Sequence, residues 1–270
     1  MDMFVATVLA LIQGVMEFLP LSSSGHIVLV KEIVPIAEAN ALAMSAVFYF
    51  STVLAVSIYF WNDIWVLIQT LMRKMGRLPV NEKDLILLYA LTAGFVPALI
   101  VGLMLESIVE KYLANVITVA IFMMISAFFF MYVEWRYYSR PPQGEINVSK
   151  GMKIGLLQLL SIIPGFSRFG MALAGGMLLG LSRYEATRFA FLLVIPIALG
   201  FGIKKSLDLI VIGGEVTWLP IIFGVVISLI FSLLVIHLFL IFVRRYTLWP
   251  FIWYTVILSS LTFYYVLFVQ

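Results

Sequence analysis

The sequence contains no cysteine, and charged residues make up only 11% of its 270 positions. The absence of cysteine excludes disulfide bonds, a thiol nucleophile and thiolate metal sites, and it leaves the redox compartment open. The shortage of charge, beside a hydrophobic content of 63%, excludes an ordinary water-soluble domain, in which about 25% of residues are charged. The composition therefore predicts a polytopic membrane protein.

Long blocks of charge and a basic leader are also missing. The net charge is only +3, and the Lys and Arg residues form short clusters, so we expect no nucleic-acid partner. The N-terminal segment carries Asp2, Gln13 and Glu17 instead of a basic run, so we expect no cleaved signal peptide. Of the two histidines, His237 lies within an apolar run and is interpreted as structural.

Apolar stretches long enough to cross a bilayer are abundant. A hydrocarbon core about 30 Å thick needs roughly 20 helical residues at about 1.5 Å per residue. Six stretches have about this length, at residues 40–60, 85–105, 113–135, 186–204, 217–243 and 248–269. The sequence therefore predicts an all-α polytopic membrane protein with six transmembrane helices in a single membrane domain, residues 1–270.

Two further regions are pairs of short apolar pieces separated by Pro, Ser and Gly. They span residues 3–36, around Leu19-Pro20-Leu21-Ser22-Ser23-Ser24-Gly25-His26, and residues 153–181, around Pro164-Gly165-Phe166-Ser167-Arg168-Phe169-Gly170. The pieces of the second region would each extend only about 15 to 18 Å as helices, roughly half a bilayer. We therefore expect two re-entrant helical hairpins, whose freed backbone groups must face protein or a water-filled cavity. An ordinary Pro or Gly kink in a spanning helix is the alternative.

The distribution of Lys and Arg predicts the orientation, because cytoplasmic loops are enriched in both residues. One side of the predicted membrane receives twelve of them: Arg73, Lys74, Arg77, Lys83, Arg136, Arg140, Lys150, Lys153, Arg183, Arg188, Arg244 and Arg245. The other side receives four: Lys31, Lys111, Lys204 and Lys205. We expect the richer side to be cytoplasmic, in the plasma membrane, with both termini outside. The first hairpin then enters from outside and the second from the cytoplasm.

The order of elements predicts an inverted-topology repeat. Each hairpin is followed by three spans, so the first repeat covers residues 1–135 and the second covers residues 151–270. An offset of 145 residues aligns Gln13 with Gln158, Ser22 with Ser167, and Gly25 with Gly170. Repeats of this kind place binding sites at the repeat interface near the membrane midplane. We therefore expect the two hairpins to meet there.

Glu17 and Arg168 are the ionisable residues in or beside the two breaks, where a charge costs roughly 2.5 to 3.5 kcal/mol at the bilayer centre. Such charges are functional by default, and the alternative is that the two pair with each other or lie near the headgroups. Gln13 lies one helical turn before Glu17, so an amide and a carboxylate can meet one ligand. Glu17 and Gln13 are also candidate ligands for a divalent cation, Mg2+ or Ca2+.

The serines of the first break stand where a helix restarts, so N–H groups without helical partners can bind an anion there. Ser22, Ser24 and Gly25 are candidate binding residues. Ser23 and His26 are candidates for the nucleophile or for proton transfer, and the sequence leaves the choice between them open. N-capping is the commoner use of serine and is the alternative.

The second break adds a cation to the same arrangement. Gly165 and Gly170 let the backbone approach a ligand closely, and Phe166 lies between them in a candidate substrate-binding segment. Ser167 can cap the following helix, and Arg168 offers a fork that matches phosphate oxygens. No Walker spacing is present, so nucleotide binding is not supported.

These motifs resemble the undecaprenyl-diphosphate phosphatase family of bacitracin-resistance proteins, and the similarity runs nearly from end to end. It lies in Gln13-x-x-x-Glu17, the Ser-Ser-Ser-Gly-His run and Pro164-Gly165-Phe166-Ser167-Arg168. In that family the first motif is Glu or Gln, three residues, then Glu, and the second is Pro-Gly-x-Ser-Arg-Ser-x-x-Thr. Phe169 and Ala172 replace the second Ser and the Thr, so we expect two hydroxyls near the phosphate to be absent.

The resemblance implies a membrane-embedded phosphatase that removes the terminal phosphate of an undecaprenyl-type diphosphate with the help of a divalent cation. Such an enzyme recycles the lipid carrier for cell-envelope synthesis. The resemblance also implies an inverted-repeat fold and a site that opens outward. The residues to which we assign catalysis are Glu17, Ser23, His26, Ser167 and Arg168.

Other functions also fit the sequence. Opposed hairpins suit a polyprenyl-phosphate transporter or flippase, and the missing hydroxyls suit a lipid-binding relative with weakened catalysis. An ion or solute carrier is disfavoured, because neither hairpin offers several carboxylates for a cation. The sequence also leaves a homodimer open.

Overall fold

The fold is entirely helical among the residues that the computed structural model describes, which are 2–34, 36–140, 142 and 144–268. The α-helices are α1 (Met3–Met16), α2 (Ser23–Ile33), α3 (Glu38–Tyr59), α4 (Trp61–Met75), α5 (Glu82–Leu113), α6 (Val116–Ser139), α7 (Val148–Gln158), α8 (Arg168–Leu178), α9 (Arg183–Ile212), α10 (Trp218–Arg245) and α11 (Trp249–Phe268). A short 3-10 helix, η1 (Leu159–Ile162), follows α7. The predicted domain, first hairpin and last span include residues 1, 35, 141, 143, 269 and 270, which lie outside the described residues.

The six predicted transmembrane segments are confirmed as helices of sufficient length and hydropathy, at α3, α5, α6, α9, α10 and α11. The main difference lies at the C-terminal ends of α5 and α9, which each continue eight residues beyond the predicted end. The apolar run stops there, but the charges that follow it pair between the two helices. Lys205 lies 2.7 Å from Glu110, and Lys204 lies 2.7 Å from Glu106. Paired charges let both helices continue where unpaired ones would be costly.

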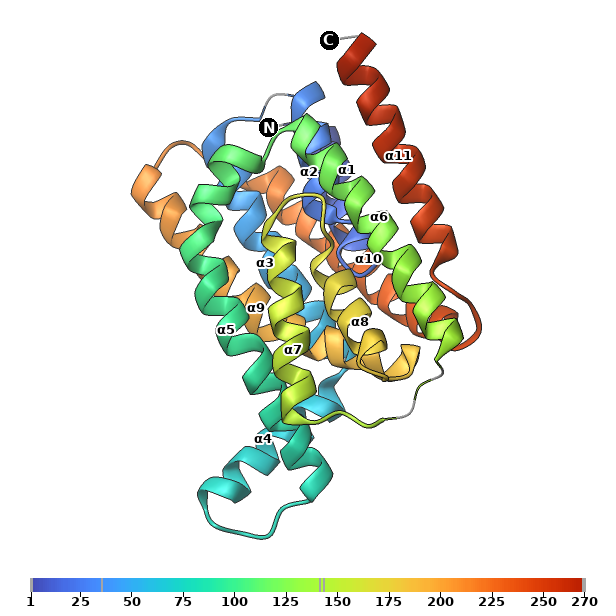
Figure 1. Cartoon of the computed structure of the whole chain (residues 1–270). Helices are drawn as coiled ribbons and strands as arrows, with labels where there is room; N and C mark the ends of the chain where they lie inside the picture. Colours follow the sequence, from blue (N-terminus) through green and yellow to red (C-terminus); the bar gives the residue numbers. More distant parts are fainter. Residues whose placement is uncertain (1, 35, 141, 143, 269–270) are drawn as a thin grey trace.

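The predicted elements do not include α4, which projects from one end of the bundle between α3 and α5 (Figure 1). Its 15 residues mix charged and apolar side chains, so it lacks the long apolar run of a span. Trp61 and Trp65 are exposed on it, and Arg73 and Lys74 occupy its last turn. Cations at that end interact favourably with the helix dipole.

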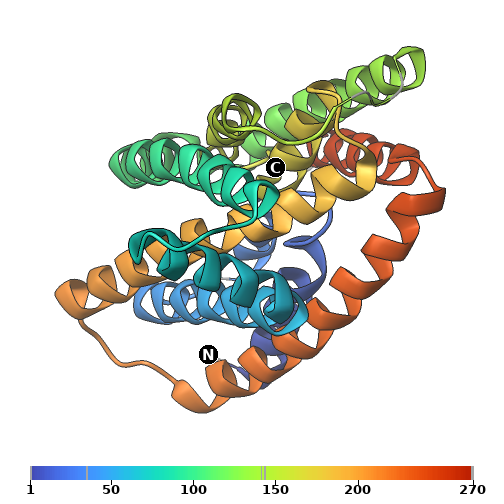
Figure 2. The ribbon, with the colours of Figure 1, turned by 90° about the horizontal axis from the view of Figure 1, so that it is seen from below.

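Helices α3 and α9 lie side by side inside the bundle (Figure 2). Helix α1 packs on α10, α7 packs on α5, and α6 packs on α11. The first two crossings are close because small residues meet there. A Cβ on Gly14 of α1 would lie 2.7 Å from the carbonyl oxygen of Ser228, and a Cβ on Gly155 of α7 would overlap the carbonyl oxygen of Gly94. Glycine therefore allows these backbones to touch.

Each of the two interrupted regions forms a pair of short helices around a break. Helix α1 ends at Met16 and α2 begins at Ser23, whereas η1 ends at Ile162 and α8 begins at Arg168. Nine of the 11 residues of α8 are buried, so its N-terminus faces the interior of the protein. The two breaks therefore position polar groups inside an otherwise apolar bundle.

Candidate functional site

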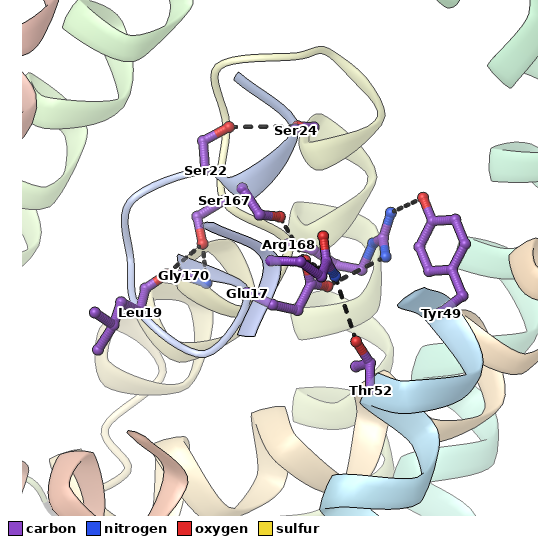
Figure 3. Close-up of polar contacts among 11 residues, drawn as sticks. Glu17, Leu19, Ser22, Ser24, Tyr49, Thr52, Ser167, Arg168 and Gly170 are labelled. Atoms are coloured by element: carbon purple, nitrogen blue, oxygen red, sulfur yellow. Dashed lines mark hydrogen bonds and ion pairs between the residues drawn. The ribbon is translucent and has the colours of Figure 1, made fainter. Parts of the chain in front are cut away.

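The two breaks lie against each other and are joined by hydrogen bonds. Ser22 Oγ accepts from the backbone N–H of Gly165 at 3.2 Å, and Ser167 Oγ donates to the carbonyl oxygen of Leu19 at 3.0 Å. Each serine also caps the helix that follows it, since Ser22 Oγ accepts from Gly25 N–H and Ser167 Oγ accepts from Gly170 N–H. Figure 3 shows the contacts of Ser167 with Leu19 and Gly170. The capping role considered for serine is therefore real here, and it also holds the two breaks together.

The backbone at this junction adopts conformations that few residues tolerate. Ser22 has a φ of 60°, in the left-handed region that is unfavourable for most residues other than glycine. Gly165 has a φ of 113°, and a Cβ there would lie 2.8 Å from Phe122 Cβ and 2.9 Å from the carbonyl oxygen of Val119. Only glycine fits at this position. Strained backbone of this kind is characteristic of functional sites.

Glu17 is the centre of a polar network that follows the end of α1. Its side chain is 6% exposed, and its Oε2 accepts from Ser23 Oγ at 2.5 Å and from Gln13 Nε2 at 3.2 Å. Gln13 Nε2 also donates to Thr52 Oγ1 of α3 at 3.4 Å. The carboxylate is therefore buried but fully engaged, as burial of a charge requires.

Arg168 completes the network from the start of α8. Its Nη1 lies 3.4 Å from Glu17 Oε1, and its Nη2 donates to Tyr49 Oη at 3.1 Å (Figure 3). The guanidinium also lies over the rings of Tyr49 and Phe201, at 5.0 and 5.1 Å from their centroids. Stacking on two aromatic rings fixes the orientation of the cation. Glu17 and Arg168 therefore pair with each other, which is one of the alternatives that the sequence leaves open. Both residues also line a cavity.

The cavity has a volume of about 170 Å³ and connects this network to one end of the bundle. Besides Glu17 and Arg168, its wall includes Lys31 of α2, Glu110 of α5 and Lys205 of α9. Lys205 pairs with Glu110 and also with Glu106, which lines the cavity too, so this end of the wall carries charges of both signs.

The predicted site residues separate into two groups. Those that line the cavity are Gln13, Glu17, Ser23, Ser24, Phe166 and Arg168. Those that lie at the junction or in the helices behind it, outside the cavity wall, are Ser22, Gly25, His26, Gly165, Ser167 and Gly170. The first group can touch a ligand, whereas the second fixes the geometry of the two breaks.

His26 is held by hydrogen bonds at both ring nitrogens. Its Nδ1 lies 2.8 Å from the carbonyl oxygen of Ser22, and its Nε2 lies 2.9 Å from Tyr254 Oη of α11. The Tyr254 ring stacks on the imidazole at 5.7 Å between centroids.

Phe169 and Ala172 face the core instead of the cavity. Both are fully buried, and Phe169 stacks on Phe191 at 4.5 Å and meets Phe239 edge-on at 5.3 Å. Neither residue lines the cavity. Positions three apart share one face of a helix, and here that face packs on α9 and α10. Phe169 and Ala172 therefore lie outside the cavity wall, and the absence of two hydroxyls near the phosphate stays a prediction.

Several residues of the cavity were not predicted as site residues. Tyr49 lines the cavity, whereas Thr52 lies outside its wall and accepts from Gln13. The two stand three residues apart on α3, and this polar pair on one face of an apolar span is a usable signal. Phe201 gave no signal, because an aromatic residue in a span is ordinary. The sequence marks Gln158 only as the predicted repeat counterpart of Gln13, and it too lines the cavity.

Two neighbouring side chains offer oxygen donors for a cation. Glu17 supplies a carboxylate and Gln13 an amide oxygen, which are ligand types suited to Mg2+ or Ca2+. No group of three or more His, Cys, Asp or Glu residues forms a metal cluster in the part of the chain that the structure describes. Gln13 faces the carboxylate with its amide nitrogen, and both oxygens of Glu17 already accept from protein donors, so a cation at this pair stays a prediction.

Comparisons with known proteins all indicate one family. Residues 6–261 match the family described as bacitracin resistance protein BacA. The chain is 34% identical to the undecaprenyl-diphosphatase of Teredinibacter turnerae, over 97% of this chain and 99% of that protein. It is 32% identical to the undecaprenyl-diphosphatase of Alteromonas mediterranea over 98% and 99%. It is also 30% identical to that of Methanosphaera stadtmanae over 97% of each chain.

Proposed function

This chain belongs to the bacitracin resistance protein BacA family, and from that premise we propose that it hydrolyses undecaprenyl diphosphate to the monophosphate inside the membrane. The product is the lipid carrier that cell-envelope synthesis uses again. The observation that carries the proposal is the meeting of Glu17 and Arg168, which are 151 residues apart in sequence, in one buried cavity. A site at this depth suits a substrate whose long isoprenoid tail stays in hydrocarbon while its headgroup enters a polar pocket.

Arg168 is the group that we assign to the phosphates. Its fork of N–H donors matches phosphate oxygens, and its two aromatic neighbours hold it in place before the ligand binds. The N-terminus of α2, with Ser23 and Ser24 at the cavity wall, adds the partial positive charge of a helix dipole. Together these groups offset the negative charge that develops on the phosphate oxygens during phosphoryl transfer.

Ser23 and Glu17 are the pair that we assign to the chemical step. The hydroxyl already donates to the carboxylate at 2.5 Å, which is the arrangement of a nucleophile and its base. In the proposed reaction Glu17 takes the proton of Ser23, and the oxygen of Ser23 attacks the terminal phosphorus. The bond from that phosphorus to the bridging oxygen breaks, and the lipid monophosphate leaves with the electron pair. Water then hydrolyses the phosphoserine, releasing phosphate and restoring the hydroxyl.

His26 and Ser167 serve the same site in a different way. Both ring nitrogens of His26 are engaged and Ser167 joins the breaks, so we assign both to positioning the two helix starts. Water attacking phosphorus directly, with Glu17 as its base, is the alternative to attack by Ser23. A variant that lacks the Ser23 hydroxyl separates the two routes.

A divalent cation, Mg2+ or Ca2+, is part of the proposal. Glu17 and Gln13 would hold it together with phosphate oxygens, and when bound it would neutralise charge on the diphosphate. In its presence Arg168 would still orient the headgroup, and the aromatic rings around it would still limit the access of water.

The arrangement in the membrane is proposed as an inverted repeat with two re-entrant hairpins, α1–α2 and α7–α8. In support, swapping residues 1–135 with residues 151–270 turns the packing of α1 on α10 into the packing of α7 on α5. The central pair α3 and α9, and the outer pair α6 and α11, exchange within themselves. With both termini outside the plasma membrane, the cavity opens outward. The proposal also keeps a homodimer as an assembly to be tested by light scattering.

The test is release of phosphate from undecaprenyl diphosphate by purified protein with Mg2+ or Ca2+. We expect Glu17→Gln to lower kcat/KM by about 10² to 10⁴, since it removes the general base. Arg168→Ala should lower it by about 10² to 10³, because a positioned donor to the developing charge is lost. Ser23→Ala should abolish release if Ser23 is the nucleophile.

Ser45→Ala is a matched control, because Ser45 also lines the cavity but donates to the carbonyl oxygen of Ala41, away from Glu17. It should keep activity within about threefold. The proposal is wrong if wild type releases no phosphate. A transporter would then be favoured if the protein moves lipid across liposome membranes, Arg168→Ala stops this movement and Glu17→Gln leaves it unchanged.

A further inference from the structure

Gln158 is a buried polar side chain that no part of the proposed reaction uses. It is the last residue of α7, it is 2% exposed, and it lines the same cavity as Glu17 and Arg168. Neither its Nε2 nor its Oε1 has a hydrogen-bond partner among the described residues. Buried amides are nearly always hydrogen-bonded, so an amide with both groups unpaired indicates a missing partner.

Gln13, the repeat counterpart of Gln158, shows which hydrogen-bond partners Gln158 lacks. Gln13 donates to Glu17 and to Thr52. The same offset of 145 residues places Ile162 where Glu17 stands and Ile197 where Thr52 stands. Both isoleucines line the cavity near the second break. Gln158 thus keeps the amide of its counterpart without either of the protein groups that would bind it.

The unpaired amide costs stability, because desolvation of its polar groups is not compensated in the folded protein. A leucine of similar size would avoid that cost. A group that is unfavourable in the free protein and lies at a cavity wall is characteristic of a binding site, where stability is lost so that a ligand can be bound. The ligand must offer an acceptor to the amide NH2, and it must reach a wall that is otherwise apolar around Ile162 and Ile197.

We propose that Gln158 is a headgroup-binding residue, whose NH2 donates to a phosphate oxygen of the polyprenyl diphosphate substrate, one that the monophosphate product keeps. The assignment rests on the proposed function. It adds a headgroup-binding residue from the second predicted repeat to the Gln13–Glu17 pair of the first. In the complex, the oxygen of the amide accepts from water that enters with the phosphate. Gln158 binds the substrate and takes no part in proton transfer.

The test compares stability and binding in Gln158→Leu. Because the leucine removes two unpaired polar groups, the melting temperature in detergent should stay the same or rise. The Kd for undecaprenyl phosphate, measured by titration, should rise about tenfold or more, since a hydrogen bond to a charged group is lost. In turnover, KM for undecaprenyl diphosphate should rise by a similar factor with kcat changed less than threefold.

Thr187→Val is the matched control. The Thr187 hydroxyl is also fully buried without a partner among the described residues, but it does not line the cavity. It should preserve or raise the melting temperature and leave the Kd unchanged. A melting temperature that falls in Gln158→Leu alone would show a structural role, and an unchanged Kd would remove the binding role, so either result overturns the proposal.

A second arm separates the source of the phosphate. In a titration with inorganic phosphate, Gln158→Leu should lose affinity by the same factor as for the lipid, or neither protein should bind. A loss of affinity for inorganic phosphate alone would assign Gln158 to the released product and overturn the lipid assignment. If wild type releases phosphate and Gln158→Leu binds the lipid as wild type does, only the role of Gln158 is overturned. Wild type that neither binds the lipid nor releases phosphate removes the proposed function together with it.

Discussion

His26 illustrates how a side chain placed beside the cavity can matter without touching a ligand. Its ring joins Ser22, at the strained start of α2, to Tyr254 of α11. Ser22 in turn holds the backbone of Gly165, so the imidazole supports the contact between the two breaks. The histidine serves this role through hydrogen bonds at both ring nitrogens.

Removal of the His26 ring should therefore weaken the junction. His26→Ala deletes the bonds to Ser22 and Tyr254, and a lost hydrogen bond costs about 0.5 to 1.5 kcal/mol. We expect the melting temperature in detergent to fall and phosphate release to fall with it. His237→Ala, at the exposed second histidine, is the control and should lower the melting temperature less. Equal losses in the two variants would contradict the role assigned to His26.

At the scale of residues, sequence alone could identify polar groups that stand out against an apolar background. Glu17, Ser23 and Arg168 stand out in this way, and all three line the cavity. The partners of His26 and Phe169 could not be predicted, because Tyr254 and Phe191 are distant in sequence and ordinary in composition. Which predicted residues line the cavity, and which support it from behind, depends on the rotation of α2 and α8.

The backbones of α7 and α5 come into direct contact where the two helices cross, and this crossing should be intolerant of any side chain at Gly155. Gly155→Ala places a methyl group onto the carbonyl oxygen of Gly94, so the helices must move apart. We expect the free energy of unfolding to fall by about 1 to 3 kcal/mol or more. Because α7 leads into the second break, phosphate release should fall with it. Thermal unfolding in detergent and the phosphate assay provide the measurements.

Gly76→Ala is the control for this change, since the nearest atom to a Cβ there is 3.5 Å away and the residue is exposed. It should leave both measurements nearly unchanged. Equal effects of the two substitutions would show that the crossing has no special tightness.

At the scale of elements, the spans were predictable because lipid requires a long apolar run. Helix α4 was not, because charges interrupt it and only the backbone shows that it continues from α3. The extra turns of α5 and α9 were also hidden, since they depend on Lys205 meeting Glu110 from another helix. Sequence patterns report local periodicity, whereas these features depend on tertiary pairing.

The whole molecule has one feature that decides where the reaction occurs, namely the side on which the cavity opens. The cavity wall includes Lys31 and Lys205, so its mouth lies at the same end of the bundle as the connection between α9 and α10. If the count of Lys and Arg gives the orientation, this end is outside, and the lipid diphosphate is met there. The opposite orientation would place the same chemistry at the cytoplasmic surface.

Single cysteines can test this orientation directly, because the chain has none of its own. Glu215→Cys lies in the connection between α9 and α10, and Glu145→Cys lies in the connection between α6 and α7, both at exposed positions. In intact cells a membrane-impermeant maleimide should label Glu215→Cys, whereas Glu145→Cys should react only after the cells are lysed. Phosphate release by both variants should stay close to wild type, which would show that neither substitution alters the fold. Labelling in the reverse pattern would place the mouth of the cavity in the cytoplasm, since both connections are fixed to opposite ends of one helical bundle.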